Sequence, residues 1–166
     1  MTGHHFSDQA NRFHLAQLNL GKLKYPLDDP RVAEFVDWLK PVNEMAERSP
    51  GYVWRLVGES GVDTRSIQPL GPDVVVTMSV WESQDALWDY VYRSGHLDAL
   101  RRRGEWFERP RRPEQVLWWV PAGHIPTLEE AFERLELLRA EGPSPRAFTF
   151  RETFTPQDLM EPSALA

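Results

Sequence analysis

His96 is the side chain of this sequence that is best suited to transfer a proton. It follows Ser94-Gly95, which interrupts a helical pattern, so the imidazole can point toward a pocket between a sheet and its helices. An imidazole titrates at about pH 6.5 and suits general acid–base catalysis. We predict a catalytic set of His96, Tyr90 and Asn19, in which the last two orient the substrate. The alternative role for His96 is structural, as a contact that caps its helix segment.

A second group of residues is suited to bind a ligand rather than to react with it. Arg55 can hold a carboxylate or phenolate, or can equally pair with a glutamate. His124 lies in a proline-flanked loop, where it could close a pocket, although packing of the loop is the commoner role for such a residue. The seven tryptophans are large surfaces that need burial in a core, an interface or a pocket. We expect the aromatic walls of a pocket to come from among Trp54, Trp81, Trp88 and Trp119.

Several kinds of chemistry are excluded by composition and spacing. There is no cysteine, which excludes disulfides, a thiolate nucleophile and cysteine-ligated metal sites. No two histidines are spaced four apart to bind a metal on a helix, and the glycines form no phosphate-binding fingerprint. We therefore expect neither a metal site nor a cofactor.

Charge and hydropathy limit the partners and the compartment. The formal net charge of −6 argues against broad binding to nucleic acid or to an anionic membrane. The arginines of residues 101–112 are interrupted by glutamates, which favours a solvated face. No apolar run approaches the length of a membrane span, and the first residues lack the apolar core of a signal peptide. We expect a cytoplasmic protein.

These residues need a scaffold, and the hydrophobic patterns predict one α+β domain. Strands are predicted over residues 12–20, 52–57, 73–81, 116–120 and 147–151. Helices are predicted over 30–48, from Ser83 onward with a break at Ser94-Gly95, and from Thr127 to Gly142. The order predicts a ferredoxin-like antiparallel sheet with helices on one face, plus a C-terminal helix-strand extension. The domain should span 12–151, with flexible tails at 1–11 and 152–166.

The predicted strands are apolar on both faces, whereas a sheet with one solvated face alternates apolar and polar residues. The C-terminal helix alone is too small to cover the second face. We therefore expect a homodimer in which a twin subunit covers it. The alternative is a monomer whose C-terminal unit folds over the sheet.

Four stretches of the sequence carry two resemblances to known families. Residues 81–87 (WESQDAL), followed by residues 94–97 (SGHL), resemble the dimeric α/β-barrel superfamily that includes the antibiotic-biosynthesis monooxygenases. Residues 101–108 (RRRGEWFE) and 117–124 (LWWVPAGH) resemble a bacterial family catalogued as domain of unknown function 3291, over nearly all of 12–151. The resemblance implies a dimeric α/β barrel and no established chemistry.

One branch of that superfamily degrades haem with an asparagine on the first strand and a tryptophan and a histidine on the second helix. Asn19 matches the asparagine, but Tyr90 and Leu100 stand where the other two residues would be. The resemblance therefore disfavours haem degradation, unless His96 substitutes for the missing histidine.

Three functions follow from these observations. The first is a cofactor-independent enzyme of monooxygenase, cyclase or isomerase type, acting on a hydrophobic aromatic or polyketide-like small molecule. The second is a non-catalytic dimeric protein that binds such a molecule, and the third, less favoured, is a haem- or metal-dependent enzyme. Polar groups that converge in one cavity would favour the enzyme, whereas a uniformly apolar cavity would favour the binding protein.

Overall fold

Four strands form one antiparallel sheet in the order β2-β3-β1-β4. Their bounds are β1 (Phe13–Lys22), β2 (Tyr52–Arg55), β3 (Val74–Trp81) and β4 (Gln115–Pro121). The computed structural model describes residues 12–93 and 96–160, with the backbone alone at positions 96, 97 and 99. With helices after β1 and β3, the chain has the predicted β-α-β-β-α-β order of a ferredoxin-like fold of the α+β class.

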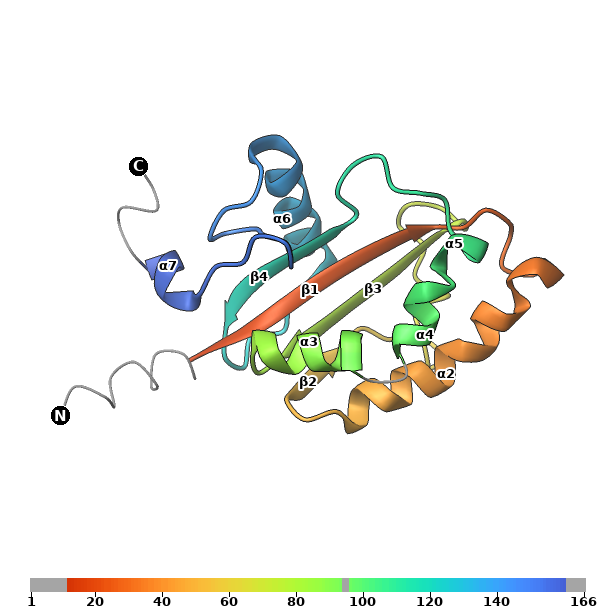
Figure 1. Ribbon diagram of the computed structural model, residues 1–166, viewed down its shortest axis with the longest axis horizontal. Coiled ribbons are helices and arrows are strands. Elements are labelled where there is room, and N and C mark those ends of the chain that lie inside the picture. Colours follow the sequence, from red (N-terminus) through yellow and green to blue (C-terminus); the bar gives the residue numbers. More distant parts are fainter. Residues whose placement is uncertain (1–11, 94–95, 161–166) are drawn as a thin grey trace.

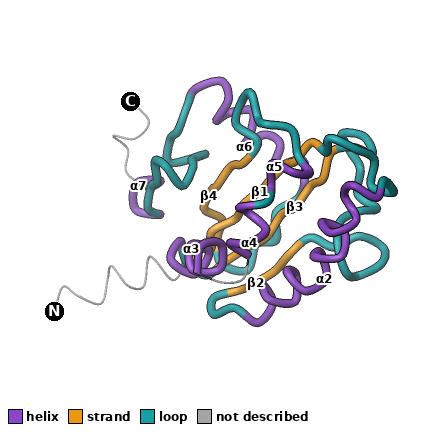
Figure 2. Tube along the Cα trace, turned by 45° about the vertical axis from the view of Figure 1, so that its right-hand side comes forward, coloured by secondary structure: helices purple, strands orange, loops and turns teal. Residues whose placement is uncertain are grey.

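Helices cover both faces of the sheet (Figures 1 and 2). One face carries η1 (Pro30–Val32), α2 (Ala33–Arg48), α3 (Gln84–Arg93), α4 (His96–Arg101) and α5 (Arg103–Trp106). The other face carries α6 (Leu128–Glu141), and the short α7 (Pro156–Met160) follows near the end of the described chain. None of the described helices combines the length and the apolar character needed to cross a membrane.

The helices begin where the sequence predicts. Asp29 accepts the backbone N–H of Arg31 at 2.8 Å, and Ser83 accepts that of Ala86 at 3.1 Å. Thr127 accepts the N–H of Glu130 at 3.2 Å, which is one half of the predicted capping box. The Glu130 carboxylate is not used for the other half, because it accepts the indole N–H of Trp118 at 3.1 Å.

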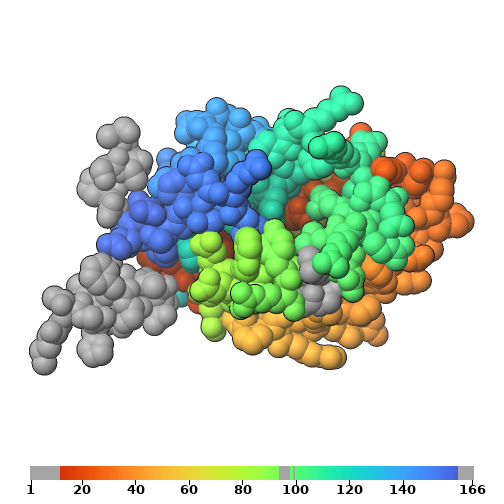
Figure 3. Space-filling view, viewed as in Figure 1, coloured from red at the N-terminus to blue at the C-terminus, as the bar shows by residue number. Residues whose placement is uncertain are grey.

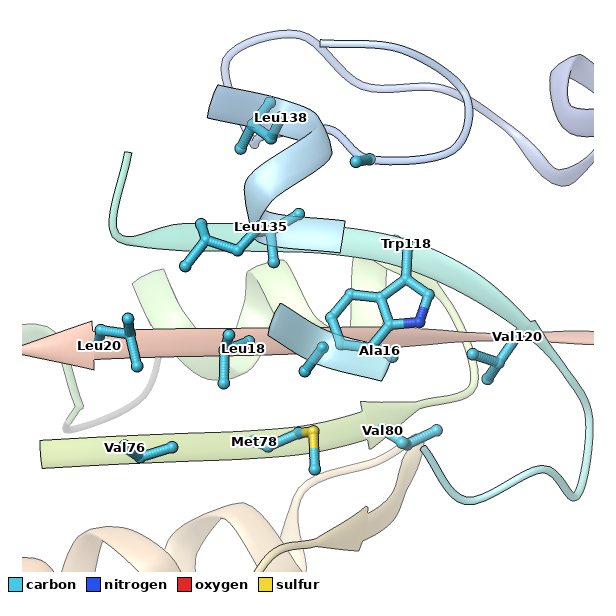
Figure 4. Packing of buried hydrophobic residues seen from close by; sticks show 13 residues of the cluster. Ala16, Leu18, Leu20, Val76, Met78, Val80, Trp118, Val120, Leu135 and Leu138 are labelled. Carbon is cyan, nitrogen blue, oxygen red and sulfur yellow. The ribbon is translucent and has the colours of Figure 1, made fainter. Parts of the chain in front are cut away.

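The second face of the sheet is buried within a single chain. Leu135 and Leu138 of α6 lie over a layer of side chains from β1, β3 and β4 (Figure 4). The fully or almost fully buried members of this layer are Ala16, Leu18, Leu20, Val76, Met78, Val80, Val116, Trp118 and Val120. The expectation that one chain leaves this face open is therefore wrong. The reason is that side chains outside α6 extend the cover: Trp54 and Leu56 pack against the layer, and the fully buried Ala147 belongs to it.

The chain after α6 wraps around the free edge of β4. Ala147 packs with the α6 layer, whereas the next residue, Phe148, packs on the opposite side of the sheet, and both are fully buried. The N–H of Phe148 donates to the carbonyl of Leu117 at 2.9 Å, and its carbonyl accepts the N–H of Leu117 at 2.8 Å. The strand predicted over 147–151 is thus an isolated bridge.

The C-terminal tail was expected to begin at residue 152, but the structure continues in contact with the core. The carbonyl of Phe154 accepts the indole N–H of Trp119 at 2.8 Å. Leu159 of α7 packs against the hydrophobic cluster that contains Trp119 and Phe148. The expected tail at 1–11, and residues 161–166 of the other, lie outside the described residues.

The arginine-rich stretch after α3 is partly structural rather than simply solvated. The guanidinium of Arg102 lies 5.1 Å from the ring centroids of both Trp38 and Trp106. It also pairs with Glu34 of α2 and with Glu105 of α5. Arg102 therefore fastens α4 and α5 to α2.

Candidate functional site

A cavity of about 250 Å³ lies between the sheet and the helices α2, α3, α4 and α5. Its floor is formed by β1 and β3, and Tyr92, Phe150 and Leu100 also line it. The surface is hollowed on this side, and atoms of β1 are visible between α4 and the C-terminal chain (Figure 3). This volume lies just below the range of about 300–1,000 Å³ that is typical of pockets for drug-sized ligands, so the cavity suits a small ligand on the helix-covered face of the sheet.

The floor carries a row of hydrogen-bonded polar side chains. Gln17 Nε2 donates to Ser79 Oγ at 3.0 Å, and Gln115 Nε2 donates to Gln17 Oε1 at 3.0 Å. Trp81 Nε1 also donates to Ser79 Oγ, at 2.9 Å. The register explains the row, because Gln17 lies opposite Ser79 and Asn19 lies opposite Gln115 on the neighbouring strand. The sequence suggested that both faces of the sheet are apolar. The structure shows that this face carries a row of polar side chains.

Asn19 lies in the middle of this floor, between Thr77 and Gln115 on the flanking strands. It lines the cavity and is half-buried. Within the described part of the chain, its side-chain amide has no hydrogen-bond partner. It is thus placed to donate to or accept from a ligand.

One wall of the cavity is a stack of aromatic rings. Trp81 is fully buried and stacks on Tyr90 with ring centroids 5.0 Å apart and an interplanar angle of 22°. Tyr52 meets the same indole edge-on at 5.7 Å. The hydroxyl of Tyr90 donates to the carbonyl of Val42 at 3.2 Å. Burial raises the pKa of Tyr90, against a smaller opposing effect of the Arg55 charge, so the phenol is protonated at neutral pH.

A second aromatic group lines the cavity. Phe35 lies 5.7 Å from Trp106 and 5.0 Å from Phe107 between ring centroids, and Trp38 lies 5.4 Å from Trp106. Gly21 makes room for this group, because a Cβ at that position would lie 2.6 Å from the ring of Phe107. This glycine is required for space.

The charged groups at the cavity are mainly cationic. Arg55, whose side chain is 11% exposed, directs both Nε and Nη2 to Glu47 Oε1 at 2.8 Å. Arg103 lies over Phe107, and its Nη2 donates to the carbonyl of Leu20 at 3.4 Å. Burial lowers the pKa of Arg103, because its charge is removed from water. The carboxylate of Asp63 is already bound by the guanidinium of Arg65 at 3.0 Å.

Four of the residues predicted from the sequence line this cavity together: Asn19, Arg55, Trp81 and Tyr90. Their roles stay predictions. The backbone of His96 begins α4 beside the cavity-lining helix α3, but its side chain lies outside the described residues.

Three other predicted residues lie away from the cavity. Trp54 packs against the α6 layer on the opposite face, because a register irregularity separates it from Tyr52 and its neighbour Arg55 takes the cavity side. Trp119 is turned toward the C-terminal chain, where it donates to Phe154. His124 is exposed, and its Nε2 lies 2.8 Å from Glu130 Oε1 of α6.

Trp88 is intermediate between these groups. It is 39% exposed on α3 and does not line the cavity. It contacts the lining residues Tyr92 and Phe150, with ring centroids 4.2 and 5.5 Å away. A direct contact between Trp88 and a ligand in the cavity is therefore not expected from the structure.

Sequence reasoning missed Gln17, Ser79 and Gln115. The signal available was a polar residue at alternate positions of strands that are otherwise apolar. For metals, no three side chains of His, Asp or Glu within the described ranges lie close enough together to form a site.

Comparison with known families gives one clear result. The family model described as Domain of unknown function (DUF3291) matches residues 14–164. The chain belongs to this family. No curated protein matches the chain significantly.

Solved structures show a more distant likeness. NE2512, a protein of unknown function from Nitrosomonas europaea, is 12% identical over 70% of this chain and 98% of its own, with a TM-score of 0.46. SnoaB, a cofactor-independent oxygenase from Streptomyces nogalater, is 15% identical over 68% and 95%, with a TM-score of 0.44. Rv0793 from Mycobacterium tuberculosis is 14% identical over 69% and 99%, with a TM-score of 0.41. A likeness of this degree says nothing of the activity of this chain.

Proposed function

We propose that this member of the DUF3291 family is a cofactor-independent enzyme acting on a hydrophobic aromatic or polyketide-like small molecule. The observation that supports this proposal is the composition of the cavity. Aromatic rings form its walls, while polar groups of Asn19, Ser79 and Tyr90 converge on it. A few placed polar groups in an otherwise apolar pocket are typical of small-molecule sites.

Each group has a distinct proposed role. Tyr90, which is backed by the fully buried indole of Trp81, is the ring of this stack that can contact a planar ligand. Asn19 orients an oxygen substituent, and Arg55 supplies positive charge beside it. His96 is the proposed proton-transfer residue, since its position begins the helix that follows α3. Monooxygenase, cyclase and isomerase reactions all fit these roles.

A non-catalytic binding protein is the second candidate, and one observation favours it. The titratable groups described at the cavity offer no base at neutral pH: Tyr90 is held protonated by burial, and Asp63 is engaged by Arg65. Catalysis by proton transfer would therefore depend on His96. A haem- or metal-dependent enzyme is less favoured than either. A cytoplasmic homodimer belongs to the same proposal.

Native mass spectrometry of freshly purified protein, followed by aerobic incubation of the released ligand with fresh protein, tests the proposal. We expect retention of an aromatic molecule and its conversion to a product. His96→Ala should retain the ligand yet lose turnover by about 10²–10⁴-fold, the usual contribution of general acid–base catalysis. The matched control is His124→Ala, which removes an exposed imidazole that pairs with α6. Retention without conversion by the wild type would favour the binding protein.

A further inference from the structure

The hydroxyl of Ser79 on β3 has both of its acceptor positions occupied. Trp81 Nε1 donates to Ser79 Oγ at 2.9 Å, and in the assigned amide orientation Gln17 Nε2 donates to the same oxygen at 3.0 Å. An indole N–H can only donate, and a serine hydroxyl accepts two bonds and donates one. No described residue accepts the remaining proton. Since Ser79 lines the cavity, that proton is available to a ligand.

Arg55 lies directly opposite Ser79 in the β2–β3 register and lines the same cavity. Only its Nε and Nη2 are engaged, both by a single oxygen of Glu47. The rest of its N–H groups have no partner among the described residues. The charge of Arg55 also acts inside the cavity, because it counteracts the effect of burial on the pKa of Tyr90. Two donors with free hydrogens thus stand side by side on one face of the sheet.

The wider electrostatics of the cavity favour negative charge in the ligand. Arg103 is a second cation at the lining, and it has no ion-pair partner within the described chain. The carboxylate at the lining, Asp63, is occupied by Arg65. An anion placed between these groups would gain charge-assisted hydrogen bonds and would meet no unpaired carboxylate.

We infer that the aromatic ligand carries an anionic oxygen, which the hydroxyl of Ser79 and the guanidinium of Arg55 hold on the floor of the cavity. This inference rests on the proposed function and names the class of molecule. Phenolates, enolates and aromatic carboxylates share the required chemistry: a planar group for the aromatic lining of the cavity and a charged oxygen in its plane. Gln17 orients the Ser79 hydroxyl through its amide, and Gln115 in turn holds that amide.

Calorimetric titration with two pairs of probes at pH 8 tests this inference. The first pair is 4-nitrophenol, which is ionised at that pH, and its neutral methyl ether 4-nitroanisole. The second pair is 2-naphthoate and its methyl ester. We expect the anion of at least one pair to bind about tenfold or more tightly than its neutral partner, the usual value of a hydrogen bond to a charged group. The pair that shows the preference distinguishes a phenolate site from a carboxylate site.

Variants then assign the preference to its residues. Ser79→Ala and Arg55→Gln should each reduce the anion-to-neutral ratio toward one, whereas Ser79→Thr, which keeps the hydroxyl, should preserve it. Ser144→Ala is the matched hydroxyl control. Arg139→Gln is the matched arginine control, because Arg139 is 12% exposed and ion-paired like Arg55 but lies on α6.

The anionic-oxygen inference and the proposed function are contradicted by different results. Equal binding of anion and neutral probe would overturn the anionic-oxygen inference and leave an aromatic site in place. A preference that survives both Ser79→Ala and Arg55→Gln would also overturn it. Failure of every probe to bind would contradict the proposed function as well.

Discussion

Tyr90 links burial at the cavity wall to the response of the protein to alkaline pH. In an unfolded chain its phenol ionises at about pH 10, whereas burial keeps it protonated in the folded protein. The folded state then holds one more proton, so the free energy of unfolding falls as pH rises past about 10 and is unaffected below that value. We expect Tyr90→Phe to weaken this alkaline fall, measured by urea unfolding at several pH values.

The comparison must use the pH dependence, because Tyr90→Phe also removes the hydrogen bond to Val42 and costs about 1 kcal/mol at any pH. Tyr92→Phe is the matched control, since Tyr92 is 38% exposed. It should leave the alkaline fall as in the wild type. Identical pH profiles for Tyr90→Phe and the wild type would contradict the prediction.

Gly21 is a second position where one side chain decides the shape of the cavity. Gly21→Ala would place a methyl group against the ring of Phe107, so that ring must move. We expect a loss of about 1–3 kcal/mol in the free energy of unfolding, as for other overpacked cores. Chemical denaturation measures it. Gly104→Ala is the control, because nothing lies within 4 Å of a Cβ at that position, and an equal loss in both variants would argue against the steric reason.

The sequence predicted which types of side chain line the cavity better than it predicted which individual residues line it. Trp54 and Arg55 are consecutive on β2, so their side chains point to opposite faces, and no single cavity could include both. The irregular register after Tyr52, which places Tyr52 on the same side as Arg55, has no signal in the sequence. Nothing in the sequence was a reason to select Ser79 and Gln17, because their hydrogen bond depends on their lying opposite each other on neighbouring strands. Only the strand register shows this.

Among the elements, the bridge at Phe148 joins the C-terminal extension to the edge of β4. Phe148 is fully buried and contacts Trp119 at 6.3 Å and Phe154 at 5.9 Å between ring centroids. We expect Phe148→Ala to cost about 3–5 kcal/mol of unfolding free energy. Truncation after Gly142 should lower the melting temperature further, because Ala147 is lost as well. Met160→Ala, at a position that is 53% exposed, is the control and should leave the transition unchanged.

Helix starts and strands that depend on local features, such as capping side chains and β-branched residues, could be predicted from the sequence. The β-branched run of β3 and the caps at Asp29, Ser83 and Thr127 were predicted correctly. The strand over 147–151 was not, because alternation of Phe148 and Phe150 resembles a strand. In the structure a turn closed by two hydrogen bonds between Ser144 and Ala147 precedes it, so the chain meets β4 only once.

For the whole molecule, the homodimer stays a prediction, but the second face of the sheet can no longer be its interface. Since α6 covers the second sheet face, the interface must lie elsewhere. Trp88 and Tyr92 of α3 are an exposed aromatic pair, and such residues are enriched in interfaces. We expect sedimentation at micromolar concentration to give twice 19.3 kDa, and Trp88→Ser to reduce the mass toward that of one chain. Leu70→Ser, at another exposed position, should not. A wild-type mass of 19.3 kDa would contradict the dimer.

The wrap of residues 142–154 around β4 has a consequence for how the protein is made. Translation delivers β1 to β4 before α6 and Phe148, so the nascent sheet emerges with one face and one edge uncovered. An uncovered edge is a template for pairing with another chain. Synthesis proceeds at about 5–20 residues per second, and until α6 and Phe148 have left the ribosome the sheet keeps this face and this edge open to other chains. Chaperone capture on the ribosome should therefore peak between the completion of β4 and the arrival of Phe148.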